Sequence, residues 1–302
     1  MGITTFLKLI RWKNLLLIIY IQILIKFIFF ETFPVATNLS TVQFIILLFS
    51  VLFISAAGNI INDIFDIQSD LINKPTEVII SKFISEEGAK KLYLYINTVG
   101  LVLGISLCLN IQKPSLSFIF IGASLLLYFY SKKIKGQAFI GNISVSFLIA
   151  IMVLLLVIFD LDFTVQNNQF YFIKGIIYVL SFFAFTLNLI RELIKDIEDV
   201  NGDYKLKMNT LPILIGRDRA KQFAFILCLI PIGLLLFIIL NYSMDYKILV
   251  LYLLLFTLIP MLYIIFKLPK SKSKKDFQKL SSILKLIMFF GLNILLIMSL
   301  NF

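Results

Sequence analysis

Nine long apolar runs divide this chain of 302 residues, and they decide what it can fold into. A helix needs about 20 mostly apolar residues to cross the hydrocarbon core of a bilayer. Soluble domains are only about half apolar, whereas 60% of this chain is hydrophobic. The sequence therefore predicts an all-α membrane protein with nine transmembrane helices. The predicted spans are Lys13–Phe30, Thr41–Ile61, Leu92–Ile111, Pro114–Tyr130, Phe139–Phe159, Phe170–Ile190, Phe223–Ile239, Leu249–Phe266 and Ile283–Leu300.

The basic residues gather in every second connection between these spans. If the N-terminus is cytoplasmic, 24 of the 28 Lys and Arg residues fall on the cytoplasmic side. The exceptions are Lys26, Lys113, Lys174 and Lys247. This asymmetry follows the positive-inside rule, so we expect a multi-pass protein of the cell membrane with its C-terminus outside.

The net charge of +11 has the same explanation, because cytoplasmic loops face an anionic leaflet. The basic segment Lys267–Lys279 lies between two spans, so we expect membrane lipids rather than nucleic acid as its partner. The chain shows no soluble appendage or long linker, and we expect a single polytopic membrane domain over residues 1–302. The oligomeric state is not encoded in any pattern of the sequence.

The composition excludes chemistry that depends on histidine and disfavours a disulfide bond. The chain has no histidine, which rules out Ser-His-Asp and Cys-His catalysis and His-ligated zinc. Its two cysteines, Cys108 and Cys228, fall inside apolar spans and are expected to be small core residues. Catalysis must therefore use carboxylates, lysines, tyrosines and a bound metal ion.

An acidic cluster occurs twice, each time at the edge of an apolar span. The second set of carboxylates, Asp196, Asp199 and Asp203, follows the first set, Asp63, Asp66 and Asp70, at a constant offset of 133 positions. On a helix, this spacing places each set within an arc of about 60°. Carboxylates that close repel one another unless a cation lies between them. The matched spacing predicts two halves with one plan, with Asp-rich motifs at residues 62–70 and 196–203.

Such clusters are suited to bind Mg²⁺ and, through it, a diphosphate. Mg²⁺ prefers one or two carboxylates together with substrate phosphate and water. Cations in the same cytoplasmic layer would bind the remaining phosphate oxygens; they are Lys74, Lys82, Lys135, Arg191 and Lys195. A single cluster would be read as surface acids balanced by lysines. Two matched clusters, each joined to an apolar span, favour a metal site.

Three segments of the chain resemble the UbiA-type intramembrane prenyltransferase superfamily. The segment Gly58–Pro75 is similar to the first Asp-rich motif of that family, with Asn62, Asp66 and Asp70 at its spacing. The segment Tyr130–Lys135 resembles its Tyr-Ser-x-x-Leu-Lys loop. The segment Arg191–Gly216 is close to its second Asp-rich motif and the Thr-Leu-Pro that follows.

The resemblance implies a nine-helix bundle around a central cavity, and Mg²⁺-dependent ionisation of an isoprenyl diphosphate. It implies that an acceptor then attacks the allylic cation. The metal-binding residues implied are Asn62, Asp63, Asp66, Asp70, Asp196, Asp199 and Asp203, with Asp66, Asp70, Asp199 and Asp203 catalytic. Tyr130 would line the reaction chamber, although a tyrosine beside Tyr128 also suits a membrane interface. Asn62, Lys74, Lys82, Lys135, Arg191 and Lys195 would bind diphosphate.

One position departs from the family pattern. Many relatives carry Arg-Pro shortly after the Lys-Pro pair, whereas this chain has Glu77 and Val78. Lys82 is the nearest candidate for the missing cation.

The acceptor is left open among several classes. The tail of the first motif, Asp70–Pro75, most resembles members that alkylate geranylgeranylglyceryl phosphate. Members that prenylate an aromatic quinone precursor (hydroxybenzoate, dihydroxynaphthoate or homogentisate) share the same metal machinery and rank second. Haem-farnesylating members rank third because their Met-x-Arg-Thr pattern is missing. A secondary transporter is an alternative from another class, but transporter acids tend to lie near the bilayer midplane.

Overall fold

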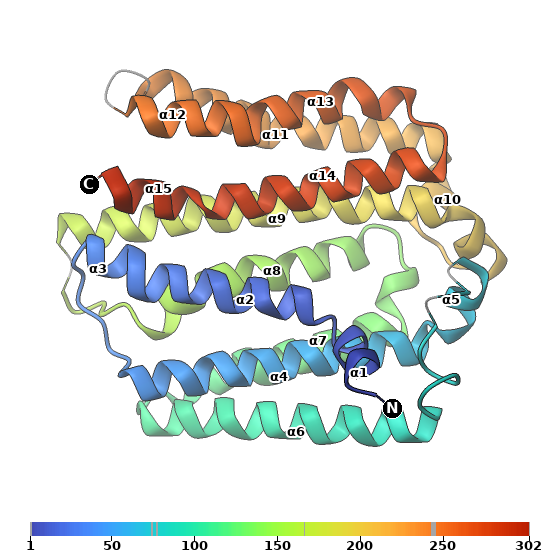
Figure 1. The fold of residues 1–302 in the computed structure, drawn as a ribbon, viewed down its shortest axis with the longest axis horizontal. Coiled ribbons are helices and arrows are strands. Elements are labelled where there is room, and N and C mark those ends of the chain that lie inside the picture. Colours follow the sequence, from blue (N-terminus) through green and yellow to red (C-terminus); the bar gives the residue numbers. More distant parts are fainter. Residues whose placement is uncertain (1, 74, 77, 166, 243–245, 302) are drawn as a thin grey trace. The chain divides into compact units, whose positions relative to one another are not determined.

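The computed structural model describes residues 2–73, 75–76, 78–165, 167–242 and 246–301. These residues form helices joined by short connections, and the bridges described among them are two isolated ones, Ile80 with Ile84 and Gln137 with Asn209. The α-helices are α1 (Ile3–Leu9), α2 (Trp12–Ile23), α3 (Phe30–Thr32), α4 (Thr41–Phe65), α5 (Ile67–Asn73), α6 (Glu86–Asn110), α7 (Ser117–Lys132), α8 (Ile140–Phe159), α9 (Asn168–Lys205), α10 (Leu211–Ile215), α11 (Arg217–Tyr242), α12 (Lys247–Leu253), α13 (Ile259–Lys267), α14 (Lys274–Leu292) and α15 (Ile294–Asn301) (Figure 1). The segments η1 (Leu24–Phe29) and η4 (Leu254–Leu258) are π-helical, whereas η2 (Pro114–Leu116), η3 (Ile134–Gly136) and η5 (Leu268–Lys270) are 3₁₀ turns.

The predicted all-α membrane fold is confirmed. Within the described ranges, nine helices are long and apolar enough to cross a membrane, and each overlaps a predicted span. The largest difference is the sixth helix, which runs over Asn168–Lys205 instead of ending near Ile190. Hydropathy falls after Ile190, but most residues of Arg191–Lys195 are good helix formers and no proline follows before Lys205, so the helix continues into a polar segment.

Two compact units make up the chain. Unit 1 contains residues 1–22 and 37–135, and unit 2 contains residues 23–36 and 136–302. The first membrane helix contributes to both, because the boundary between Gln22 and Ile23 lies inside it. The expectation of a single polytopic domain stays a prediction.

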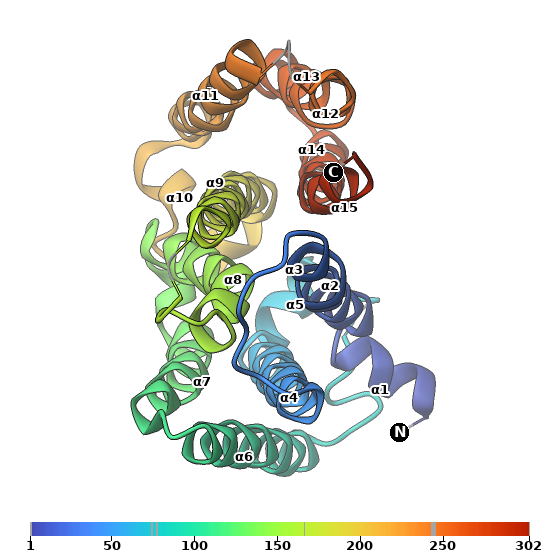
Figure 2. The same ribbon diagram turned by 90° about the vertical axis from the view of Figure 1, so that its left-hand side faces the viewer.

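In unit 1, α4 packs against α6 and α7 through small residues (Figure 2). Gly100 and Gly104 lie one turn apart on α6, and Ser50 of α4 donates a hydrogen bond to the Gly100 carbonyl over 2.7 Å. A Cβ atom at Gly104 would lie 2.6 Å from Cγ of Phe120 and 2.7 Å from the Ser50 hydroxyl. Small residues at this spacing allow membrane helices to approach closely, which fixes the place of α4 in the unit.

In unit 2, the long helix α9 packs against α8, α11 and α14. Its N-terminus is capped by Asn167, whose side chain accepts a hydrogen bond from the Phe170 N–H over 2.8 Å. At 1.5 Å per residue, its 38 residues extend about 57 Å, nearly twice the hydrocarbon thickness of a bilayer. The apolar part of α9 is therefore anchored among membrane helices, and the second acidic cluster lies on its continuation.

Lys26, one of the four basic residues outside the predicted cytoplasmic side, forms a buried ion pair. Its Nζ atom lies 2.7 Å from Oδ2 of Asp160, at the end of α8 in the same unit. The Asp160 side chain is fully buried and that of Lys26 is 10% exposed. Because each charge neutralises the other, the bilayer tolerates both.

The close contact at Gly104 generates a first prediction. Replacing Gly104 with Ala should lower the thermal unfolding midpoint of the detergent-purified protein, because overpacking costs about 1–3 kcal/mol. Gly122→Ala on α7 is the matched control, since a Cβ there meets nothing within 4 Å. Equal midpoints for the two variants would show that the α4–α6 contact does not require a glycine at position 104.

Candidate functional site

The first acidic cluster lies where α4 ends and α5 begins. Asn62 and Asp63 occupy the last turn of α4, and the helix ends at Phe65. Asp66 follows as the capping residue with φ −90° and ψ 0°, and Asp70 lies in the first turn of α5. The continuous helix assumed for the arc of three carboxylates is thus interrupted here. The backbone stays coiled, because the Asp66 N–H donates to the Asn62 carbonyl and the Asp70 N–H donates to the Asp66 carbonyl.

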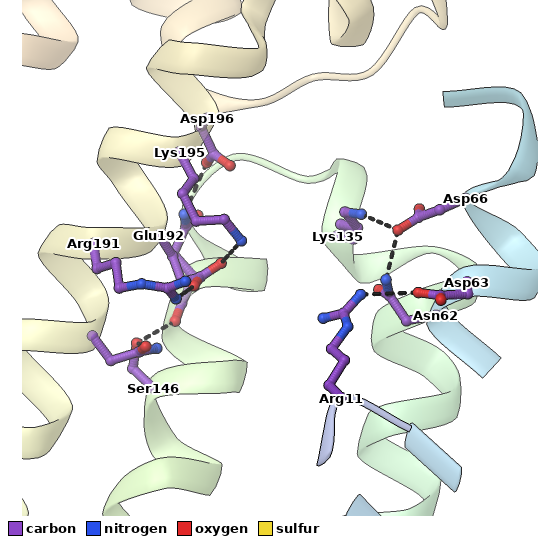
Figure 3. A network of polar contacts seen from close by, with 12 residues as sticks. Arg11, Asn62, Asp63, Asp66, Lys135, Ser146, Arg191, Glu192, Lys195 and Asp196 are labelled. Carbon is purple, nitrogen blue, oxygen red and sulfur yellow. Dashed lines mark hydrogen bonds and ion pairs between the residues drawn. The ribbon is translucent and has the colours of Figure 1, made fainter. Parts of the chain in front are cut away.

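Two carboxylates of this cluster, Asp63 and Asp66, are held by Asn62 of the cluster itself and by side chains from elsewhere in unit 1 (Figure 3). Oδ2 of Asp66 accepts hydrogen bonds from Nδ2 of Asn62, over 2.6 Å, and from the Lys135 ammonium. Oδ1 of Asp63 accepts from the Arg11 guanidinium over 2.9 Å. Asp66 is only 5% exposed, so these hydrogen bonds satisfy a carboxylate that is largely removed from water.

The two cations of this cluster remain charged. Burial by itself lowers the pKa of Lys135, but the adjacent Asp66 carboxylate, with a smaller contribution from Asp70, raises this pKa above its ordinary value. Burial likewise lowers the pKa of Arg11, and Asp63 raises it above its ordinary value. The site therefore presents fixed positive charge beside its carboxylates at neutral pH.

Arg11 reaches the cluster from a strained elbow between α1 and α2. Its φ is +53°, a value that non-glycine residues seldom adopt. The elbow is held by Asn59, one turn before Asp63 on α4, which donates a hydrogen bond to the Ile10 carbonyl over 2.9 Å. Strain of this kind persists where surrounding contacts compensate it, often at functional sites.

The second cluster lies on one uninterrupted helix, since α9 carries Asp196, Asp199 and Asp203. A chain of polar side chains from α8 and α9 positions Asp196 (Figure 3). Asn188 donates to the Ser146 hydroxyl over 3.1 Å, and this hydroxyl donates to the Asn142 carbonyl over 2.6 Å. The Asn142 amide in turn donates to Asp196 over 2.8 Å.

The two predicted phosphate-binding cations of α9 share one acidic partner. Glu192 accepts a hydrogen bond from the Arg191 guanidinium over 2.5 Å, and its other carboxylate oxygen lies 3.5 Å from Nζ of Lys195. The Lys274 ammonium lies 3.7 Å from Oδ1 of Asp199, beyond hydrogen-bond length. Asp203 is buried. Glu192 therefore fixes where both cations lie on this face of the helix.

Three predicted site residues remain to be placed. Lys82 is exposed in the connection before α6, and its ammonium donates to the Pro75 carbonyl over 2.7 Å. Tyr130 is half-buried near the end of α7. Lys74 lies outside the described residues, as does Glu77. Within the described part of the chain, no group of three or more carboxylate, thiol or imidazole side chains is already gathered as a metal site.

Sequence patterns missed Arg11, and they gave Asn142 and Glu192 no role. Arg11 precedes Asp63 by 52 residues and carries no local signal. Asn142 and Ser146 are spaced by one turn at the start of an apolar helix, a pattern that marks an internal polar face. Glu192 lies between Arg191 and Lys195 in the sequence, a pattern typical of ordinary surface charge, so only the structure shows its contacts.

These features define a class of protein: an all-α membrane protein with two acidic clusters near helix ends. The model of the UbiA prenyltransferase family matches residues 29–293. The chain belongs to the UbiA prenyltransferase family, and it is an integral membrane protein. The prediction of a membrane-bound prenyltransferase is confirmed at this level.

Similar curated proteins share one name. The chain is 31% identical to digeranylgeranylglyceryl phosphate synthase of Pyrococcus abyssi over 228 residues, covering 75% of this chain and 74% of that protein. It is 33% identical to the enzyme of the same name from Methanobrevibacter smithii over 217 residues, covering 69% and 72%.

Two solved structures have a similar fold. One is described as digeranylgeranylglyceryl phosphate synthase, with a TM-score of 0.64, 27% identity and 99% of each chain covered. The other is a UbiA homolog from Archaeoglobus fulgidus bound to GPP and Mg²⁺, with a TM-score of 0.58, 17% identity, and 96% and 99% covered. At that identity, the second likeness bears on the fold alone.

Proposed function

We propose that this chain is a Mg²⁺-dependent enzyme that transfers a geranylgeranyl group from geranylgeranyl diphosphate to geranylgeranylglyceryl phosphate. The observation that carries the proposal is the similarity to digeranylgeranylglyceryl phosphate synthases over about three quarters of the chain. The solved structure described by the same name supports it at 27% identity over 99% of the chain. Its product is an ether lipid with two prenyl chains.

At the first cluster, the residues that hold Mg²⁺ are Asn62, Asp63, Asp66 and Asp70. Their carboxylate and amide oxygens are hard donors of the type that Mg²⁺ prefers. Lys135 and Arg11 already lie against Asp66 and Asp63, so they are placed to bind phosphate oxygens beside the metal. Mg²⁺ held by these residues would supply positive charge to neutralise a departing diphosphate.

At the second cluster, Asp196, Asp199 and Asp203 are the metal-binding residues. The fit to a cation rests on Asp199, whose Oδ1 atom is buried and accepts no hydrogen bond from the described residues. The Asn142 amide orients Asp196, and Glu192 orients Arg191 and Lys195 toward phosphate. The expectation that both clusters bind one diphosphate stays a prediction.

We infer that both clusters lie on the cytoplasmic side of the cell membrane. The support is the basic residues of the predicted inner connections, which carry 24 of the 28 Lys and Arg residues. Tyr130, at the end of α7, then lies near the same interface, where it lines the reaction chamber. The apolar spans supply surroundings that exclude water from an allylic cation.

The test of this function is a transfer assay with defined acceptors. Purified protein in lipid nanodiscs is given labelled geranylgeranyl diphosphate, Mg²⁺ and either geranylgeranylglyceryl phosphate or an aromatic quinone precursor. We expect labelled digeranylgeranylglyceryl phosphate, and we expect EDTA to abolish it. Product formed only from the aromatic acceptor would assign the chain to quinone synthesis. Absence of both turnover and Mg²⁺-dependent binding would favour a transporter.

The metal assignment generates a separate prediction. Asp66→Asn and Asp199→Asn should each reduce kcat by at least about 100-fold, because each removes charge that stabilises the transition state through Mg²⁺. The thermal unfolding midpoint should change little. Glu87→Gln is the control, since this acid is exposed and pairs only with Lys91 in the contacts described for it. A near-normal rate in either Asp variant would remove that cluster from the catalytic machinery.

A further prediction concerns the cation that binds diphosphate in place of the Arg-Pro found in many relatives. Arg11→Gln should raise the KM for the prenyl diphosphate about tenfold, because a charge-assisted hydrogen bond is worth roughly 1.5–3 kcal/mol. Lys82→Gln should raise it about twofold, since the Lys82 ammonium is hydrogen-bonded to the Pro75 carbonyl, whereas Arg11 binds a carboxylate of the cluster. Initial rates over a range of substrate concentrations measure both. A larger effect at Lys82 than at Arg11 would return the role to Lys82.

A further inference from the structure

An apolar groove lies on unit 2 between η4–α13 and α14 (Figure 2 shows these helices near the C-terminus). Its volume is about 360 Å³. One wall is formed by Phe256, Pro260 and Tyr263, and the opposite wall by Ile283, Ile287 and Phe290. Leu255 and Leu286 line it as well and are exposed, so the groove opens to the surroundings of the helix bundle.

The groove follows from a local defect in the helix that contains Pro260. Proline has no N–H to donate to the carbonyl four residues earlier, which belongs to Phe256. The chain is π-helical over Leu254–Leu258, just before this proline. One end of the groove is closed by aromatic contact, since the Phe256 and Phe290 ring centroids are 4.9 Å apart. The Tyr252 hydroxyl donates to the Phe290 carbonyl over 2.8 Å and fixes that end.

The other end of the groove carries positive charge. The Lys279 ammonium lies over the Tyr263 ring, 5.6 Å from its centroid, one turn before Ile283 on α14. Lys267 follows Tyr263 by one turn on α13. Residues four apart share a helix face, so each wall ends in a lysine. The Tyr263 ring, with the Lys279 ammonium over it, therefore borders one end of the apolar channel, and Lys267 lies one turn beyond that ring, close enough to Asp276 to interact with its charge.

The length of the channel matches one leaflet of a bilayer. At 1.5 Å per residue, α14 rises about 16 Å from Lys279 to Phe290. The hydrocarbon core is about 30 Å thick, so one leaflet contributes roughly half of that. Because η4, α13 and α14 belong to helices that are long and apolar enough to cross a membrane, the groove lies on a membrane-embedded part of unit 2. An acyl chain therefore fits the channel in both polarity and length.

We propose that this groove is a binding site for one anionic phospholipid, with an acyl chain between α13 and α14 and its phosphate at Lys267 and Lys279. The charge of the two lysines selects an anionic headgroup over a zwitterionic one. The aromatic end sets how deep the chain inserts. The site is independent of the acidic clusters, because no residue that lines it belongs to them.

Quenching by brominated lipid tests the proposal, since the chain contains a single tryptophan, Trp12. In a Trp12→Phe background, Tyr263→Trp places the reporter in the groove. The protein is reconstituted in vesicles that mix phosphatidylcholine with brominated phosphatidylglycerol or with brominated phosphatidylcholine. We expect the groove reporter to favour phosphatidylglycerol at least about fivefold, as two lysines near an anionic headgroup imply.

Two controls make the outcome decisive. Lys267→Gln with Lys279→Gln should bring the preference close to one, whereas Lys91→Gln on α6 should leave it unchanged. A reporter at the exposed Leu94 of α6 should show no preference, because no groove residue lies there. A preference that survives loss of both lysines, or a groove reporter that neither lipid quenches, would overturn the proposal. Recovery of fluorescence on adding geranylgeranyl diphosphate would assign the groove to substrate instead and overturn it equally.

Discussion

Carboxylates beside membrane helices require a cation, and the polar architecture of each unit is built on this requirement. In unit 1, Asp63 pairs with Arg11 and Asp66 with Lys135. A carboxylate left without a partner at low dielectric would protonate and lose its use as a metal ligand. Each pair therefore satisfies a carboxylate that is shielded from water and holds a cation beside it, which is the combination that a metal–diphosphate complex needs.

The membrane fold was predictable because apolar runs of about 20 residues have few alternatives. What hydropathy did not predict is where a helix ends once it leaves the apolar layer. The helix α9 continues through Asp196 and Asp203 to Lys205, since no proline interrupts it and its one glycine after Ile190, Gly202, falls in the last turn. The helix α4 stops at Phe65 inside an equally polar segment, again without a proline. The same carboxylate spacing therefore occurs on two different backbones, a continuous helix in α9 and a helix end in α4.

The position of the acidic residues near the ends of membrane helices was predictable as well, and their role as metal ligands stays a prediction; most of their partners were not predictable. Repeated Asp spacing is a local pattern, whereas the Lys135 contact with Asp66 spans 69 residues. The position of Arg11 depends on its left-handed backbone conformation, which the neighbouring residues do not predict. Glu192 was overlooked because an acid between two cations looks like surface charge. Contacts between distant segments arise from packing, and a single sequence does not record them.

The pair of Lys26 and Asp160 has a consequence for how the protein is made. The two residues are separated by 134 positions, so the first helix enters the bilayer long before its counter-ion has been synthesised. During that interval the lysine must extend toward interfacial water, and the helix cannot reach its final depth. Arrival of the fifth span supplies the opposite charge and lets both helices settle. The N-terminal helix is therefore the first to insert into the membrane, but it reaches its final position only after the fifth span has been inserted.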